Sequence, residues 1–249
     1  MKKIVLLFMS AMALSLAISC NKENNSPIIE FKDPLVLQAL IESYDEDGDG
    51  QISLKEADKV TELSLSNKGI HSFDEISYFP NVKRIWINNN QLTSIDVSNN
   101  MLLESLHCNN NQLTTLDVSN NLLLNYLDCK DNQLTTLDVS NNILLDRFFC
   151  QNNQLTTLDV RNNVALYWLH IANNQLTSID LSNNLDLEFF YCMNNKLTVL
   201  DLSKNKLIGD DPINFLLGNP LKKLIISYYG MFREGWRVYY KDIIEYVYD

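Results

Sequence analysis

A leucine recurs every 21 residues through most of the chain, and this period constrains the fold more than any other feature. The repeated residues are Leu92, Leu113, Leu134, Leu155, Leu176 and Leu197. A single unit of this length cannot bury its own apolar edge, whereas stacked units share one continuous core. The period therefore predicts a solenoid in which each turn holds a short strand and a return segment.

Within a unit, the apolar residues follow the pattern L-x-x-L-x-C-x-x-N-x-L. One copy is filled by Leu103, Leu106, Cys108, Asn111 and Leu113. This pattern resembles the leucine-rich repeats of bacterial internalins, especially those that carry a cysteine in the strand. The resemblance covers about residues 60–208 and implies an α/β solenoid, a right-handed leucine-rich-repeat fold with a 21-residue period.

The N-terminus, "MKKIVLLFMSAMALSLAISC", has the features of an export signal. Two lysines precede an apolar run that is too short to span a bilayer comfortably, and small residues precede Cys20. The ending "AISC" resembles a bacterial lipobox, which implies that Cys20 is acylated and anchors the protein to the cell envelope, on the outer membrane and facing the surface. A protein secreted after cleavage nearby is the alternative.

The charge balance excludes one class of partner. The chain has 20 basic and 31 acidic residues, and removal of Lys2 and Lys3 with the signal leaves a formal net charge of −13. Such a balance disfavours nucleic acids and anionic lipid surfaces. We therefore expect no nucleic-acid partner, and membrane contact only through the lipid anchor.

The stretch "DEDGDGQISLKE" matches all twelve positions of the EF-hand calcium loop. The predicted ligands are Asp45, Asp47 and Asp49 through carboxylates, Gln51 through its carbonyl, Ser53 through a water and Glu56 through both oxygens. Asp33 as N-cap and Pro34 at the first helical position predict an entering helix, and "LKEADKV" predicts an exit helix. An acidic surface loop that binds nothing is the alternative.

The sequence contains one such loop, whereas EF-hands usually work in pairs. A lone hand outside the cell is expected to bind calcium with a dissociation constant of about 10⁻⁴ to 10⁻³ M, and so to stay loaded. We interpret it as a structural clip. The chain then divides into a signal peptide at 1–19, a tether at 20–32, an EF-hand cap at 33–59, repeats at 60–208, and a last strand with a C-terminal cap at 209–249.

Three columns of repeated residues are interpreted as scaffold. The asparagines Asn90, Asn111, Asn132, Asn153, Asn174 and Asn195 are expected to bond backbone groups where the chain leaves each strand. The aspartates Asp74, Asp96, Asp117, Asp138, Asp159, Asp180 and Asp201 are interpreted as Asx-type turns, with a bound cation as the alternative. Cys108, Cys129, Cys150 and Cys192 share a slot with isoleucine, which indicates buried thiols in place of disulfides or zinc ligands.

Side chains alternate along a strand, so two positions per turn should face outward on the concave sheet. The first reads Arg84, Ser105, Tyr126, Arg147, Trp168, Phe189 and Lys223, and the second reads Trp86, His107, Asp128, Phe149, His170, Tyr191 and Ile225. The predicted partner-binding residues are Trp86, Tyr126, Phe149, Trp168, Phe189 and Tyr191. Exposed apolar patches of this kind mark binding surfaces.

The internalin resemblance implies a protein ligand, possibly a host one, for this face. A glycan ligand is the alternative, with Asp128, Arg147 and Trp168 as its candidate residues. A third reading is a purely structural envelope component, in which the rings only stack on one another. His107 and His170 have no nucleophile at a defined position, so we predict no catalytic residues and no enzyme activity. Beyond the repeats, a short helix from Asp211 and a tail with Trp236 and Tyr240 are expected to cover the last turn.

Overall fold

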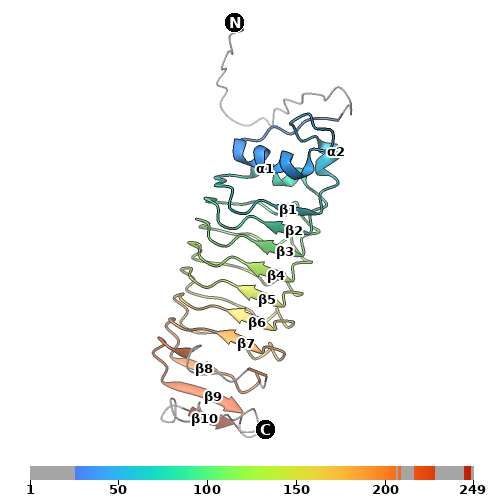
Figure 1. The fold of residues 1–249 in the computed structure, drawn as a ribbon. Helices are drawn as coiled ribbons and strands as arrows, with labels where there is room; N and C mark the ends of the chain where they lie inside the picture. The colour runs from blue at the N-terminus through green and yellow to red at the C-terminus, as the bar shows by residue number, and fades with distance from the viewer. Residues whose placement is uncertain (1–25, 206, 209–215, 228–243, 248–249) are drawn as a thin grey trace.

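The fold was obtained as a computed structural model, which describes residues 26–205, 207–208, 216–227 and 244–247. Seven three-residue strands run parallel, one per turn, in a single sheet (Figure 1). They are β1 (Glu62–Ser64), β2 (Arg84–Trp86), β3 (Ser105–His107), β4 (Tyr126–Asp128), β5 (Arg147–Phe149), β6 (Trp168–His170) and β7 (Phe189–Tyr191). The predicted 21-residue period is confirmed, because from β2 to β7 each residue pairs with the residue 21 positions later.

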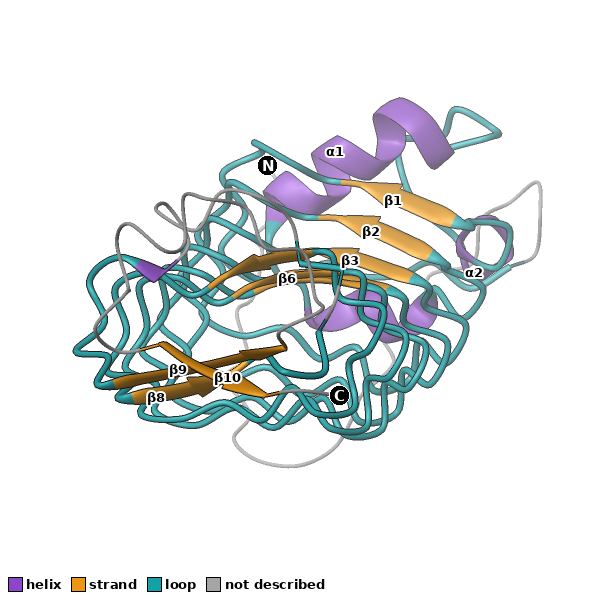
Figure 2. Cartoon of the chain, turned by 90° about the horizontal axis from the view of Figure 1, so that it is seen from below, coloured by secondary structure: helices purple, strands orange, loops and turns teal. Residues whose placement is uncertain are grey.

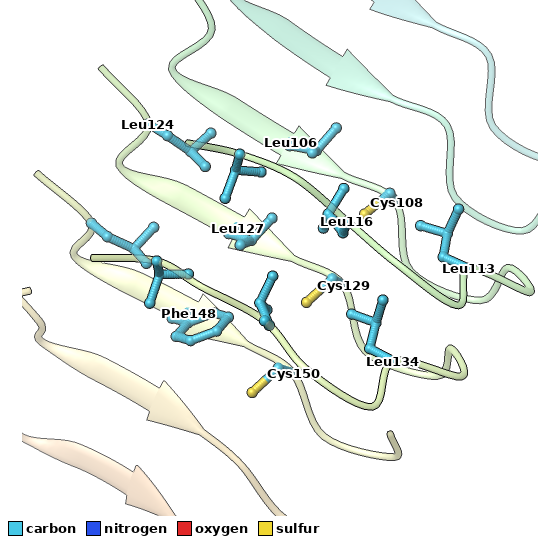
Figure 3. Close-up of a cluster of buried hydrophobic side chains, with 14 of the residues drawn as sticks. Leu106, Cys108, Leu113, Leu116, Leu124, Leu127, Cys129, Leu134, Phe148 and Cys150 are labelled. Carbon is cyan, nitrogen blue, oxygen red and sulfur yellow. The ribbon is translucent and has the colours of Figure 1, made fainter. Parts of the chain in front are cut away.

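The core lies between the strands and the return segments of each turn. Leu106, Leu127 and Phe148 occupy equivalent places on successive strands, and Figure 3 shows them stacked, with Cys108 and Cys129 in the neighbouring column. All five side chains are fully buried. Burial raises the pKa of the cysteine thiols, and the cysteines are unbridged, as predicted.

The first asparagine column performs the predicted scaffold role. Asn132 Nδ2 donates to the carbonyls of Cys108 and Cys129, at 3.1 and 3.0 Å, and its Oδ1 accepts from the backbone N–H of Leu113 at 2.9 Å. Each such amide therefore joins two consecutive turns. Asn219 makes the same kind of bonds at the end of the repeats, to Leu197, Cys192 and Leu216.

A second asparagine column holds the turns that precede the strands. Its members are fully buried or nearly so, and they are Asn100, Asn121, Asn142, Asn163, Asn184 and Asn205. Asn121 Nδ2 donates to the carbonyls of Val97 and Asn100, at 3.0 and 2.9 Å. The sequence signal for this column was the repeated "SNN", in which the second asparagine is the buried one.

The aspartate column forms the predicted Asx-type turns from Asp96 onward, but the prediction was wrong for Asp74, which begins the 3₁₀ helix η1 (Asp74–Tyr78) and accepts a bond from Lys32 Nζ at 2.6 Å. Asp117 Oδ1 accepts from the backbone N–H of Ser119 at 2.9 Å, and Asp96, Asp138, Asp180 and Asp201 make the same bond two residues on. The hydroxyl of Ser119 lowers the pKa of the Asp117 carboxyl, and its backbone N–H adds to this effect. In the turn of Asp159, Arg161 stands where the other turns have serine. Its guanidinium and its backbone N–H lower the pKa of the Asp159 carboxyl to about 2.

Two helices close the N-terminal end of the solenoid. Helix α1 (Pro34–Tyr44) begins at the predicted N-cap, where the Asp33 side chain accepts from Leu35 N–H at 3.0 Å. The other Asp33 oxygen accepts from His71 N–H at 2.7 Å, which fixes α1 to the first turn. Helix α2 (Leu54–Ala57) is a single turn and is shorter than the predicted exit helix, and the 3₁₀ helix η1 (Asp74–Tyr78) follows β1.

The C-terminal end differs from the prediction. Strand β9 (Lys223–Ser227) lies between β8 (Val199–Asp201) and β10 (Ile244–Val247) in a separate sheet on the opposite side of the solenoid (Figure 2). Leu224 pairs with Leu200 of a return segment, not with a residue of β7. Lys223 and Ile225 therefore do not extend the first sheet, and this prediction was wrong because the chain loses its 21-residue spacing after residue 205.

Other predicted features lie outside the described residues: the signal peptide, Cys20, the first part of the tether up to residue 25, the start of the helix from Asp211, Trp236 and Tyr240. No helix in the described part of the chain is both long and apolar enough to cross a membrane.

Candidate functional site

The outer face of the seven-stranded sheet carries a continuous row of aromatic rings. We call the residues Trp86, Tyr126, Phe149, Trp168, Phe189 and Tyr191 the aromatic strip. All six are half-buried, and they come from five strands. Side chains alternate along each strand, so Leu127 and its equivalents point into the core and their two neighbours point outward. The rings therefore lie on the outer face of the sheet.

The rings contact one another from turn to turn. Tyr126 and Phe149 have centroids 5.6 Å apart, Phe149 and Trp168 5.4 Å, and Trp168 and Phe189 4.8 Å. These distances are typical of aromatic pairs that attract each other. The predicted alternative, rings that pack on one another across strands, is therefore part of the structure, and the three pairs are tilted, with interplanar angles of 40°, 59° and 30°.

Two histidines complete the row, and the sequence prediction did not include them among the binding residues. His107 lies between Trp86 and Tyr126, with centroids at 5.6 and 4.4 Å, and so bridges the turn that has no aromatic residue of its own. His170 packs on Tyr191 at 5.0 Å. Both histidines stand in the predicted outward-facing columns, and this position could have identified them as part of the row.

Both histidines are uncharged at neutral pH. Burial lowers the pKa of His170 to about 4, with a smaller contribution from the positive charge of Lys130. The same two causes lower the pKa of His107. The two histidines therefore add aromatic surface and no charge to the row.

The centre of the sheet also holds a covered ion pair. Asp128 was predicted to face solvent, but it is only 6% exposed, because its neighbours on adjacent strands cover it. Lys130 Nζ lies 3.4 Å from the Asp128 carboxylate. Burial raises the pKa of Asp128 despite this lysine. Ser105, also predicted to be outward-facing, is 8% exposed and lies 3.1 Å from His107 Nε2.

Charged residues border the row and pair with one another. Arg84 bonds Glu62, Lys83 Nζ lies 3.4 Å from Glu104, and Arg147 Nε lies 4.0 Å from Asp146. Hollows of 510, 190 and 380 Å³ lie beside Asp138, Asp180 and Tyr44, away from the aromatic strip. An apolar centre with a polar border and an open surface suits a large partner better than a small enclosed ligand.

The second candidate site is the loop between α1 and α2. One carboxylate oxygen from each of Asp45, Asp47 and Asp49 lies within 4.8 Å of the other two, and this triad could bind a metal. Gly48 and Gly50 have φ angles of +72° and +78°, and their N–H groups donate to Asp45 at 2.8 and 2.9 Å. These bonds fold the loop around the three carboxylates.

The remaining predicted ligands are Gln51 in the loop, Ser53 at the N-cap of α2 and Glu56 within α2, and the structure does not bring Glu56 into the group of three aspartates. The Glu56 carboxylate is almost fully buried and accepts from Glu46 N–H, Ser53 N–H and the Ser53 hydroxyl, at 2.8, 2.8 and 2.7 Å. Ser53 is the N-cap of α2, and with Glu56 it forms a capping box. Gln51 N–H donates to Asp49 at 2.9 Å.

In paired EF-hands, each calcium loop pairs with the loop of the other hand. Here the loop pairs with an earlier segment of the same chain. Ile29 N–H donates to the carbonyl of Ile52 at 2.8 Å, and Leu54 N–H donates to the carbonyl of Pro27 at 2.8 Å. This two-stranded contact is antiparallel and joins Ile28 to Ser53. The segment from Pro27 to Ile29, which was predicted to be part of the tether, therefore pairs with the loop and supports a hand that has no second loop within the described residues.

No protein-family model and no curated protein sequence matches the chain. A domain of InlJ from Listeria monocytogenes that includes a cysteine ladder matches 88% of the chain at 23% identity, with a TM-score of 0.50, and the chain spans 60% of it. Internalin C2 of the same organism matches at 19% identity and a TM-score of 0.63, over 88% of the chain and 94% of its own length. A plant peptide hormone receptor, RGFR1 in complex with RGF2, matches 63% of the chain at 26% identity, with a TM-score of 0.53 over 27% of its length.

These similarities confirm the predicted leucine-rich-repeat solenoid and its likeness to bacterial internalins. Proteins with this fold typically mediate protein binding and are typically not enzymes. The InlJ cysteine ladder parallels the column of Cys108, Cys129 and Cys150 in this chain.

Proposed function

We propose that the protein is a non-enzymatic, surface-exposed binding protein of the bacterial cell envelope, and that it captures a partner protein through the aromatic strip. One observation carries this proposal: the row of half-buried rings continues from Trp86 to Tyr191 on the solvent side of the sheet. Aromatic residues are prominent among the hot spots of protein interfaces. The internalin-like fold and the peptide-bound plant receptor support an adhesin-like role.

The geometry favours a protein over a glycan. A sugar ring stacks on the open face of an aromatic ring, whereas the faces of the strip contact neighbouring rings, for example at 4.8 Å between Trp168 and Phe189. The glycan alternative also needs the Asp128 carboxylate, which is covered and bound to Lys130. Ring edges and a bordering set of charges match a protein surface better.

Replacement of Trp168 by alanine is expected to weaken partner binding by roughly 30-fold or more, because Trp168 contacts three other rings of the strip. The measurement is binding of the full chain to arrays of extracellular matrix proteins, cell-surface proteins and glycans. Val199→Ala, which removes an exposed side chain from β8 on the other sheet, is the matched control. A glycan signal lost only in Trp168→Ala would move the function to carbohydrate capture, and a protein signal unchanged by it would refute the proposed site.

The loop at Asp45–Glu56 is proposed to hold one calcium ion as a structural clip. Three carboxylates that converge within 4.8 Å match the hard oxygen ligands that calcium prefers. The bond between Ile29 and Ile52 would couple the bound ion to the segment that precedes α1, and α2 leads directly into β1. The clip would thus stabilise the N-terminal end of the solenoid.

The envelope location rests on the lipobox-like "AISC" and the export signal. A diacylglycerol thioether with an added N-acyl chain supplies more than the two signals that stable anchoring requires. Cys20→Ser is therefore expected to move the protein from the membrane fraction to the soluble fraction, as measured by cell fractionation and immunoblot. If the variant sediments with membranes as the unchanged chain does, the lipid-anchor proposal is wrong.

A further inference from the structure

A second apolar surface lies on the turns that precede the strands, and it is more exposed than the aromatic strip. The side chains are between 40% and 62% exposed. They are Met101, Leu102, Leu122, Leu123, Ile143, Leu144, Val164 and Leu185, and we call them the turn ridge. The sequence interpretation did not single out this surface, and the proposed partner binding does not use it.

Local structure forces these residues outward. In the first such turn, Leu103 N–H donates to the carbonyl of Asn100 at 3.0 Å, and both end residues are fully buried. Asn100 is fixed in turn by bonds from its Nδ2 to the carbonyls of Ile76 and Phe79. The two central residues of each turn must therefore project into solvent, where a scaffold accepts polar residues at no cost to the core. Both are large and apolar in the first three turns, and in the last two turns Ala165 and Asp186 hold the second central position.

The flanks of the turn ridge differ in charge. On one side, amides precede the turns at Asn99, Asn120, Asn141, Asn162 and Asn183. On the other side lie Glu104, Asn125, Asp146, Tyr167 and Glu188. Lys83 and Arg147 lie 3.4 and 4.0 Å from Glu104 and Asp146 and offset part of this acidic charge, and the rest disfavours an anionic lipid surface.

We propose that the turn ridge is a homodimer interface in which two copies lie side by side and parallel, related by a two-fold axis along the ridge. Eight half-exposed apolar side chains present on the order of 700 Å² per copy, close to the roughly 800 Å² per partner of a standard stable interface. The ridge residues repeat once per turn, at the spacing of the strands. The ridge of a second copy has the same repeat, so each turn can meet the equivalent turn of the other copy.

Charge selects the parallel arrangement. Rotation about an axis along the ridge exchanges the flanks, so that the acidic flank of one copy faces the amide flank of the other. Rotation about an axis across the ridge would place the acidic flank of one copy against the acidic flank of the other, where like charges repel. The parallel dimer leaves the aromatic strips of both copies facing away from the interface, since the strip and the ridge lie on different faces of each turn.

Sedimentation velocity of the full chain carrying Cys20→Ser tests the proposal. We expect a dimer at about 10 µM. In the double variant Leu122→Glu/Ile143→Glu, the dissociation constant of the dimer should rise by about 100-fold or more. Leu217→Glu changes another exposed leucine outside the ridge and should remain dimeric. Thermal melts followed by circular dichroism show whether the Cys20→Ser chain and its two glutamate variants are folded.

Cross-linking determines the arrangement. In the parallel dimer each ridge residue meets its own counterpart, so Met101→Cys and Leu185→Cys should each cross-link to themselves, while the four described native cysteines are buried. Cross-links only in a mixture of the two variants would reveal an antiparallel pair and overturn the proposal. A monomeric chain, a dimer unaffected by the glutamates, or a monomer that binds phosphatidylcholine vesicles through the ridge would overturn it as well.

Discussion

Replacement of Asn132 by alanine is expected to lower the free energy of unfolding by about 1 to 3 kcal/mol. The substitution leaves the buried Leu113 N–H without its acceptor, whereas the carbonyls of Cys108 and Cys129 each keep a second amide donor, from Asn111 and Asn153. Each buried backbone group that loses its hydrogen bond costs about 1 to 3 kcal/mol. Chemical denaturation followed by circular dichroism measures the effect.

Asn141→Ala is the matched control for this prediction. The Asn141 side chain is exposed and makes one bond, from Nδ2 to the carbonyl of Ser119 at 3.1 Å. Its loss is expected to cost no more than about 1 kcal/mol. Equal losses in the two variants would show that the amide column does not hold the turns together.

Calcium is expected to stabilise the chain by about 1 to 2 kcal/mol at millimolar concentration, given the affinity of a lone extracellular hand. The melting temperature should rise by roughly 2 to 5 °C on addition of calcium and fall again with EDTA. Asp47→Asn should reduce this shift without changing the melting temperature in EDTA, because it keeps the oxygen that accepts from Asp49 N–H but removes one of the three charges.

Glu56→Ala separates the two roles of that residue. Its carboxylate caps α2 and bonds Glu46 N–H, so its removal should cost about 2 to 4 kcal/mol even in EDTA. Calcium should add nothing to the variant. A normal calcium shift in both Asp47→Asn and Glu56→Ala would refute the clip, and an unchanged stability of Glu56→Ala in EDTA would refute the capping role.

The repeats could be predicted from sequence in detail, because each turn imposes the same burial at the same position. Leu106, Leu127 and Phe148 are buried as their spacing requires, and the Asn132 amide bonds the backbone as expected. The prediction ended where the spacing ended. Leu224 looked like the next core leucine of the first sheet, but it pairs with Leu200 on the opposite sheet.

The surface was harder to predict, because exposure depends on neighbouring turns. Alternation placed Asp128 on the outer face, but it does not reveal that side chains from adjacent strands cover the carboxylate. Nor does alternation reveal that the His107 ring packs between the rings of Trp86 and Tyr126. The turn ridge was missed for another reason: Met101 and Leu122 fall between two repeated patterns, and their exposure follows from the buried asparagine before them.

The most direct test of the binding account is photo-cross-linking in living cells. A photoreactive phenylalanine analogue at Phe149, in the middle of the aromatic strip, is compared with the same analogue at Val199 on the opposite sheet. We predict a protein adduct from position 149 that is lost when Trp168→Ala is added, and none from position 199. Adducts from position 199 alone, or adducts from position 149 that persist with Trp168→Ala, would contradict the assignment of the aromatic strip as the partner-binding surface.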